Sequence, residues 1–173
     1  MDIDIDVESL DVEVPELSQV GLVVEDLEDG MDRWGAMLGL EPWRVMRFEP
    51  PGLSEATYQG EEREMSFRLA VAEAGPMDVE LIEPLEGENS YTEHLAEHGE
   101  GIHHVACFDY DDPRAVAESY IDAGVPVVQS GVYHGSTFWY FDFREAMNGT
   151  ILEIVEPSDE GPAEPDRMYH PNE

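Results

Sequence analysis

The feature that most constrains the fold of this chain is a short segment that occurs twice. Residues 79–85 read VELIEPL, and residues 152–158 read LEIVEPS. Each copy places one glutamate, Glu80 or Glu153, among apolar residues in a pattern typical of a buried strand. Two matching strands of this unusual kind predict that the chain contains two copies of one structural unit.

The elements predicted around the two segments also recur in one order. A buried strand at 17–24 precedes a run with helical spacing of apolar residues that ends at Gly39, and a strand at 103–108 precedes a helix at 113–123. Further strands are predicted at 43–48, 56–60, 65–72 and 79–82, and then at 125–129, 138–143 and 151–155. The order β-α-β-β-β therefore occurs twice, which predicts an α+β fold.

The two first strands also match in their distance to the glycine that ends the following helix. That distance is 20 residues from Gln19 and 20 residues from His104. We therefore predict that Gln19 and His104 occupy equivalent positions, and that Glu80 and Glu153 form a second equivalent pair.

Composition divides the rest of the chain. Residues 1–14 alternate acidic residues with Ile, Val or Leu, which predicts a strand or a solvated tail. A capping-box pattern at Ser90 and Glu93 and a stop at Gly99 predict a short helix. The predicted organisation is an acidic N-terminal extension at 1–14, a first βαβββ module at 15–88, a connecting helix at 89–100, a second βαβββ module at 101–157, and an acidic, Pro-rich tail at 158–173.

The charge of the chain excludes several classes of partner. It contains 41 acidic residues against 8 basic ones, all of them arginine, and its formal net charge is −33. Nucleic acids and anionic membranes bind through Lys and Arg, so neither is expected as a partner. An acidic surface without lysine resembles that of proteins from halophilic organisms, whose cytoplasm holds molar salt. We expect folding to depend on salt, because salt screens the self-repulsion of such a surface.

The sequence also predicts a cytoplasmic location. The N-terminal residues carry no basic segment and no continuous apolar run, so no signal peptide is expected. No apolar stretch approaches about 18 residues, the length of a membrane-spanning helix. The single cysteine, Cys107, excludes an internal disulfide and fits a reducing compartment.

The repeated glutamates predict a metal site. Side chains alternate faces along a strand, so each glutamate points away from its apolar neighbours. A buried carboxylate costs several kcal/mol unless it is paired, hydrogen-bonded or bound to a metal. With Gln19, Glu80, His104 and Glu153 on matched strands, a divalent cation is the simplest common partner.

Other interpretations of these residues stay open. A lone glutamate in a strand usually lies on a solvated face, and only its recurrence argues against this. His103 points inward instead of His104 if the register slips by one residue. His94 and His98 have a spacing that suits zinc, although a polar helical face in so acidic a chain is usually just solvated.

Taken in order, these segments resemble a known superfamily. They are QVGLVVEDLEDGMDRWGAMLGLEPW, YTEHLAEHGEGIHHVACF, VELIEPL and ILEIVEP. The chain is similar over roughly residues 17–157 to the vicinal oxygen chelate superfamily, the group of glyoxalase I, methylmalonyl-CoA epimerase and related dioxygenases. The resemblance implies two βαβββ modules that form an open curled barrel around one divalent ion, either zinc, nickel, cobalt, manganese or iron. The set Gln19, Glu80, His104 and Glu153 matches that of eukaryotic-type glyoxalase I, whereas the epimerases usually have His in place of Gln19 and Gln in place of Glu80.

The resemblance also implies an activity. A metal-dependent lyase, isomerase or epimerase would move a proton at a carbon next to a carbonyl, with Glu153 and then Glu80 as the bases. Its partner would be a small-molecule carbonyl or thioester substrate, and the protein would be a homodimer. Arg68 falls near the place of a separate base in the epimerases and would grip a substrate carboxylate, unless it is an exposed strand residue.

Two other members of this superfamily provide alternative functions. A metal-free protein of the bleomycin-resistance type would sequester a small molecule in the same cleft. A ring-cleaving dioxygenase needs two histidines and one carboxylate for iron, and this chain supplies one aligned histidine.

Overall fold

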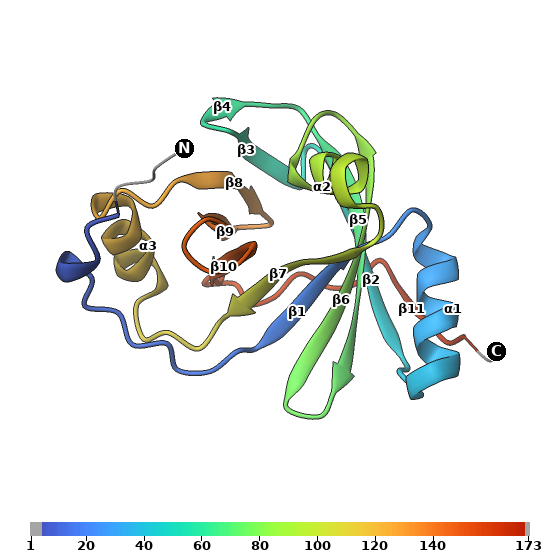
Figure 1. The fold of residues 1–173 in the computed structure, drawn as a ribbon. Helices are drawn as coiled ribbons and strands as arrows, with labels where there is room; N and C mark the ends of the chain where they lie inside the picture. Colours follow the sequence, from blue (N-terminus) through green and yellow to red (C-terminus); the bar gives the residue numbers. More distant parts are fainter. Residues whose placement is uncertain (1–4, 172–173) are drawn as a thin grey trace.

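A single curled sheet forms the framework of the computed structural model, which describes residues 5–171. Its strands are β1 (Gln19–Val23), β2 (Trp43–Phe48), β3 (Leu53–Tyr58), β4 (Glu61–Glu62), β5 (Ser66–Ala74), β6 (Met77–Glu86), β7 (Gly101–Cys107), β8 (Val127–Tyr133), β9 (Ser136–Phe143), β10 (Thr150–Glu156) and β11 (Arg167–Tyr169). They lie in the order β11-β2-β5-β6-β1-β7-β10-β9-β8-β3-β4 (Figure 1). The predicted α+β class and open curled sheet are confirmed.

The first strands of the two repeats meet at the centre of the sheet. β1 pairs with β7 in antiparallel fashion, while β6 runs parallel to β1 and β10 runs parallel to β7. The two strands that carry Glu80 and Glu153 therefore flank the central pair symmetrically. This arrangement brings segments more than seventy residues apart in sequence into one short stretch of sheet.

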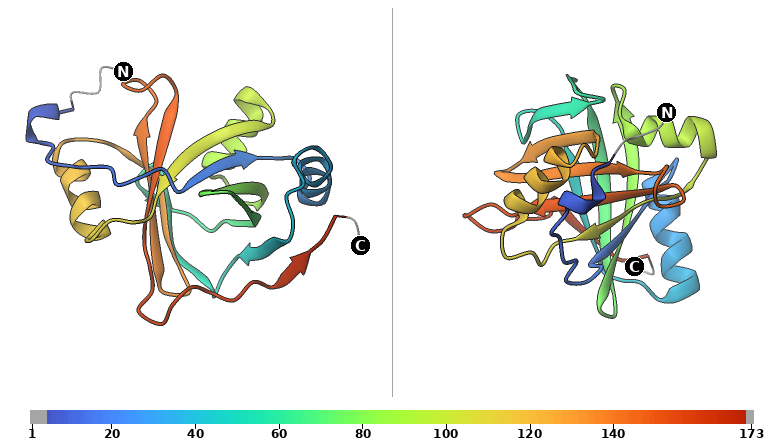
Figure 2. Two further views of the ribbon diagram at one scale, coloured as in Figure 1. Left: turned by 90° about the horizontal axis from the view of Figure 1, so that it is seen from below. Right: turned by 60° about the vertical axis from the view of Figure 1, so that its left-hand side comes forward.

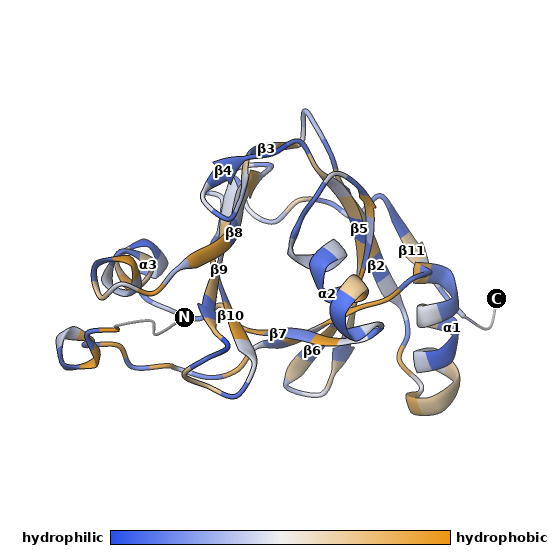
Figure 3. Ribbon diagram, turned by 45° about the horizontal axis from the view of Figure 1, so that its top comes forward, coloured by the Kyte–Doolittle hydropathy of each residue, from blue (hydrophilic) through white to orange (hydrophobic). Residues whose placement is uncertain are grey.

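Helices cover the outer face of each half. α1 (Leu27–Leu38) packs against β5 and β6, and α3 (Pro113–Asp122) packs against β10, while α2 (Ser90–His98) connects the halves (Figure 2). Each outer core is apolar, with Leu27 and Met31 of α1 fully buried in the first and Phe141 and Ile154 in the second. In Figure 3 the apolar colour lies on stretches of the strands such as β8 and β9.

The capping residues and glycines in the sequence predicted the helix ends to within about one residue. Gly39 ends α1 in the left-handed conformation with φ 70°, which glycine adopts without steric cost. The N-terminus of α2 differs from the prediction by one residue. Its N-cap is Asn89, whose side chain accepts from Tyr91 N and Thr92 N, so the capping box pairs Asn89 with Thr92 instead of Ser90 with Glu93.

Both terminal segments differ from their predictions. Within residues 5–14 the structure has a 3₁₀ turn at Val7–Ser9 and no strand, and Ile5, Leu10 and Val12 pack against the core beneath α3. The predicted strand at residues 1–4 lies outside the described residues. The C-terminal residues 158–171, which we call the strap, cross the open side of the curled sheet and add β11 to the edge of β2 (Figure 2). No helix among residues 5–171 is long and apolar enough to span a membrane.

Candidate metal centre

Three predicted side chains meet at the centre of the sheet. His104 Nε2 lies 3.4 Å from Glu80 Oε2 and 3.2 Å from Glu153 Oε2. All three residues are buried, with relative exposures of 1% for His104, 6% for Glu80 and 7% for Glu153. Among residues 5–171 this is the one group of three or more His, Cys, Asp or Glu side chains placed to share a metal ion.

A glycine on the central strand makes room for this meeting. Gly21 of β1 pairs with Glu80 on one side and with His104 on the other. A Cβ atom at Gly21 would lie 2.0 Å from Cε1 of His104, so any larger residue would displace the imidazole ring. The absence of a side chain at this position therefore lets His104 lie between the two carboxylates.

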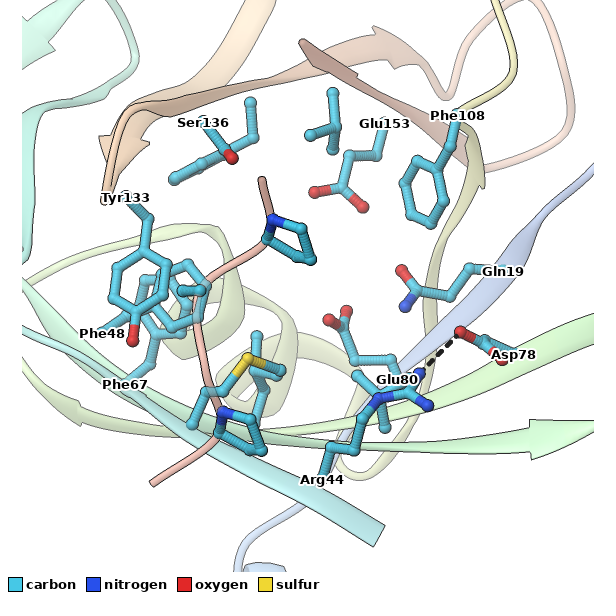
Figure 4. Close-up of a pocket in the computed structure, with 18 of the residues that line it drawn as sticks. Gln19, Arg44, Phe48, Phe67, Asp78, Glu80, Phe108, Tyr133, Ser136 and Glu153 are labelled. Carbon is cyan, nitrogen blue, oxygen red and sulfur yellow. Dashed lines mark hydrogen bonds and ion pairs between the residues drawn. The ribbon is translucent and has the colours of Figure 1, made fainter. Parts of the chain in front are cut away.

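The fourth predicted ligand lines the same cavity. Gln19, which is 4% exposed, and both glutamates border a space of about 520 Å³ enclosed by the curled sheet. Figure 4 shows the side chains of Gln19, Glu80 and Glu153 pointing toward one another into this space. The structure thus brings together all four residues that the repeat singled out, Gln19, Glu80, His104 and Glu153.

Burial and mutual contact set the charges of the group. Burial by itself lowers the pKa of His104, but attraction to Glu153 and Glu80 outweighs it and raises the pKa to about 9. Burial raises the pKa of Glu80, and the charge of Glu153 adds to that rise. Without a metal the imidazolium of His104 therefore neutralises part of the carboxylate charge.

The donor set fits a divalent cation. Neither Glu80 Oε2 nor His104 Nε2 completes a hydrogen bond, although both atoms are buried. Buried polar atoms without partners are rare in folded proteins, and they are expected where an ion binds. Two carboxylates, one imidazole and one amide oxygen suit Zn²⁺ and the first-row divalent metals.

His103 supports His104 from behind. Its Nδ1 lies 3.0 Å from Nδ1 of His104, on the side opposite to the glutamates. Burial lowers the pKa of His103 well below its usual value, so the ring is neutral and can accept the Nδ1–H of His104. The sequence offered His103 as the alternative ligand, whereas the structure makes it the partner that fixes the orientation of His104.

Two tyrosines complete the wall around His104. The ring of Tyr140 lies 4.8 Å from the His104 ring, and its hydroxyl group lies 2.7 Å from that of Tyr91. Burial raises the pKa of both tyrosines well above the usual value, so both stay neutral. Sequence reasoning missed this pair, because Tyr91 on α2 and Tyr140 on β9 come together only through the tertiary fold.

Arg68 does not reach the cavity. Its neighbours Phe67 and Leu69 line the cavity, so strand alternation turns Arg68 to the opposite face of β5. There its guanidinium group donates to Glu83 at 2.6 Å and to Glu28 at 3.0 Å. The predicted grip on a substrate carboxylate is therefore not available to Arg68 in this cavity.

The other histidine pair gathers no third metal ligand. The rings of His94 and His98 lie 5.2 Å apart, and that of His94 lies 5.5 Å from His103. Within residues 5–171 these histidines are not part of a group whose ligand atoms converge. The predicted alternative zinc site on α2 therefore finds no support in the geometry.

Comparison with known proteins finds a family model that matches this chain and a bacterial protein of similar sequence. The model of the family described as Glyoxalase/Bleomycin resistance protein/Dioxygenase superfamily matches residues 18–143. The uncharacterized protein YqjC of Bacillus subtilis (strain 168) is 24% identical over 145 residues, which cover 82% of this chain and 91% of that protein.

Solved structures of similar fold include methylmalonyl-CoA epimerases. A variant of the Streptomyces coelicolor enzyme in complex with 2-nitronate-propionyl-CoA is 22% identical, with a TM-score of 0.61, and the match covers 83% of this chain and 97% of that one. The Mycobacterium tuberculosis enzyme is 22% identical, with a TM-score of 0.57, and the match covers 87% of this chain and 93% of that one. At these sequence identities the similarity shows a shared fold and nothing further.

Proposed function

The chain belongs to the glyoxalase/bleomycin resistance protein/dioxygenase superfamily, and from this premise we propose that it is a metal-dependent lyase, isomerase or epimerase. The reaction would move a proton at a carbon atom next to a carbonyl group. One observation carries the proposal: one imidazole lies within 3.2–3.4 Å of two buried carboxylates, and both carboxylates line a ligand-sized cavity.

The four residues at the centre would hold the metal ion. Gln19, Glu80, His104 and Glu153 supply the ligands, and His103 orients the imidazole. A bound divalent cation would polarise a carbonyl oxygen and so make the neighbouring C–H bond more acidic. The metal is one of zinc, nickel, cobalt, manganese or iron, all of which accept this donor set.

Glu153 is the base in this proposal. Its carboxylate points into the cavity and can take a proton from a carbon atom held there. Glu80 lies on the other side of His104 and could return a proton to the ligand. Return to the same carbon gives an epimer, and return to the neighbouring carbon gives an isomer.

Hydrogen exchange tests the proposal directly. Purified protein is loaded with each candidate metal and incubated in D₂O with a panel of 2-oxo, 2-hydroxy-thioester and malonyl-type compounds. We expect deuterium to enter one compound, and Glu153→Gln to slow this exchange about 10²- to 10⁴-fold, the usual contribution of a general base. The matched control is Glu156→Gln on the same strand, because Glu156 pairs with Arg114 on the protein surface. Exchange that persists unchanged in Glu153→Gln would contradict the assignment.

The lining of the cavity favours a second candidate function. Phe48, Phe67 and Phe138 contribute to a largely apolar wall that suits a hydrophobic guest. A metal-free protein that sequesters such a guest would contain sub-stoichiometric metal that added ions do not restore. Elemental analysis before and after metal loading therefore separates the binder from the enzyme. The domain boundaries, the homodimer, the cytoplasmic location and the adaptation to high salt stay predictions.

A further inference from the structure

We propose that the ligand of this cavity is a small carbonyl compound with an aryl or branched apolar body and no phosphate group, and that the protein does not use coenzyme A thioesters. This inference rests on the proposed function, because it names the substrate class of the same site. It departs from the epimerases of similar fold, one of which is bound to a propionyl-CoA analogue.

The cavity has one polar end and one aromatic end. Gln19, Glu80 and Glu153 form the polar end, where the oxygen atoms of a ligand would face the metal centre. The ion pair of Arg44 and Asp78 also lines the cavity beside them, so this arginine is matched by a carboxylate (Figure 4). Figure 4 shows Phe48, Phe67 and Tyr133 gathered on the side away from Gln19. Apolar side chains of Met46, Leu69, Val71 and Val155 also line the cavity. A ligand that fits therefore has adjacent oxygens at one end and an apolar body at the other.

The aromatic end is a wall of rings that stack on one another. The ring of Phe48 stacks on that of Tyr133, with centroids 3.6 Å apart and an interplanar angle of 14°. The rings of Phe48 and Phe67 stack with centroids 4.8 Å apart and an interplanar angle of 23°. The ring of Phe138 meets Phe48 edge-on, with an interplanar angle of 69°. Because aromatic rings prefer stacked or edge-to-face neighbours, these walls favour an aryl group over a polar chain.

The cations that could hold phosphate groups are already occupied. All eight arginines lie within residues 5–171, the chain has no lysine, and every arginine forms an ion pair with a carboxylate. The pairs are Arg33–Glu100, Arg44–Asp78, Arg47–Glu49, Arg63–Glu61, Arg68–Glu83, Arg114–Glu156, Arg144–Asp142 and Arg167–Glu28. Coenzyme A carries a diphosphate and a further phosphate, so its phosphate groups would have to compete with these carboxylates for the guanidinium groups.

The N-termini of α1 and α3, which are another common kind of phosphate site, are also filled by acidic side chains, whereas the neutral Asn89 caps α2. Asp26 caps α1 and accepts from Asp29 N, and Asp112 caps α3 and accepts from Ala115 N. A second anion at these ends would meet a carboxylate where it needs free N–H groups. The net charge of −33 adds a general repulsion.

The strap limits the length of the ligand. Its residues Pro162, Ala163, Glu164 and Pro165 line the cavity and bring one more carboxylate to the open side. The strap is fastened beyond this point, because Asp166 N donates to Val45 O at 2.9 Å and Arg47 N donates to Asp166 Oδ2 at 2.7 Å. A long thioester arm would have to pass this apolar and acidic cover, whereas a small ligand can lie beneath it.

A pair of hydroxamates tests the inference by binding alone. Benzohydroxamate and acetohydroxamate present the same two metal-binding oxygens and differ in the phenyl group. We titrate the full-length, metal-loaded protein with each compound by calorimetry in about 1 M KCl, where the Debye length is about 3 Å and repulsion is screened. Benzohydroxamate should bind about 10- to 100-fold more tightly, as expected for burial of a phenyl group. Methylmalonyl-CoA should show no binding at concentrations that saturate the protein with benzohydroxamate.

Variants locate the effect in the aromatic end. Phe48→Gln should bring the affinity ratio of the two hydroxamates close to one, and Phe48→Leu should keep most of it because the wall stays apolar. The matched control Trp34→Gln, on α1 outside the cavity, should leave the ratio unchanged. Circular dichroism verifies that each variant is folded.

Each outcome bears on one proposal or the other. Equal affinities for the two hydroxamates, or tight binding or turnover of methylmalonyl-CoA, overturn the substrate class and leave the metal site intact. A protein that takes up no metal overturns the proposed function instead. In that case the binding of benzyl alcohol to the metal-free protein still tests the preference for an aryl group. Binding that is lost in Phe48→Gln supports this preference, and an absence of binding to the wild-type protein overturns it.

Discussion

Protons and metal ions should compete for His104. The pKa of this residue is raised to about 9 by the two glutamates, so the ring is protonated at pH 7 in the metal-free protein. A histidine binds a metal only as the neutral imidazole. Each metal ion that binds at pH 7 must therefore release about one proton from this site, and the number falls to about half a proton at pH 9.

The size of the effect follows from the pKa. Between pH 7 and 8 the apparent metal affinity should rise about tenfold, and between pH 7 and 9 about 50-fold in total, which corresponds to about 2.3 kcal/mol. Above pH 9 the dependence should level off, because His104 is then neutral without the metal. The sign is fixed by the raised pKa, since a lowered pKa would leave the affinity flat across this range.

The assay is a competition against a chromophoric zinc chelator at a series of pH values, corrected for the protonation of the chelator. Calorimetry in buffers with different ionisation enthalpies counts the released protons independently. The variant His104→Gln should bind zinc more weakly and lose the slope, and His98→Gln, on an exposed face of α2, should keep it. A wild-type affinity that does not change between pH 7 and 9, with no proton released, would refute the reasoning.

Three further predictions address the support of the site and the surface. His103→Leu should lower zinc affinity about 10- to 100-fold, and His103→Asn should restore most of it because its side-chain oxygen can accept the Nδ1–H of His104; the same competition assay measures both. Gly21→Ala should destabilise the fold by about 1–3 kcal/mol in urea unfolding and weaken zinc binding, because its Cβ meets the His104 ring. The control Gly30→Ala should do neither, because its Cβ would meet only the ends of side chains, Leu81 at 3.2 Å and Val24 at 3.5 Å. The thermal midpoint should rise from dilute buffer to multimolar KCl, and a flat midpoint would contradict the predicted salt dependence.

The candidate site was largely predictable because the repeat shows which positions of the two copies correspond and which face of the strand each residue occupies. Glu80 and Glu153 each lie one residue from apolar neighbours, so alternation alone turned both away from the outer cores. The matched spacing of Gln19 and His104 then placed two further polar residues on equivalent strands. Arg68 shows the limit of this reasoning, since a shift of one residue along a strand moves a side chain to the other face.

The sequence by itself determined the two units, their helices and the buried acidic pair, because these depend on periodicity and helix-ending residues within short windows. Only the tertiary structure decided which strands became neighbours at the edges. β3 leaves the first unit to pair with β8 of the second, and the strap returns from the C-terminus to pair with β2. Edge strands pair through backbone N–H and C=O groups of segments far apart in the chain. These groups are the same in every residue, so the sequence does not show which edge strands will pair. The cover over the cavity depends on the same long-range contacts.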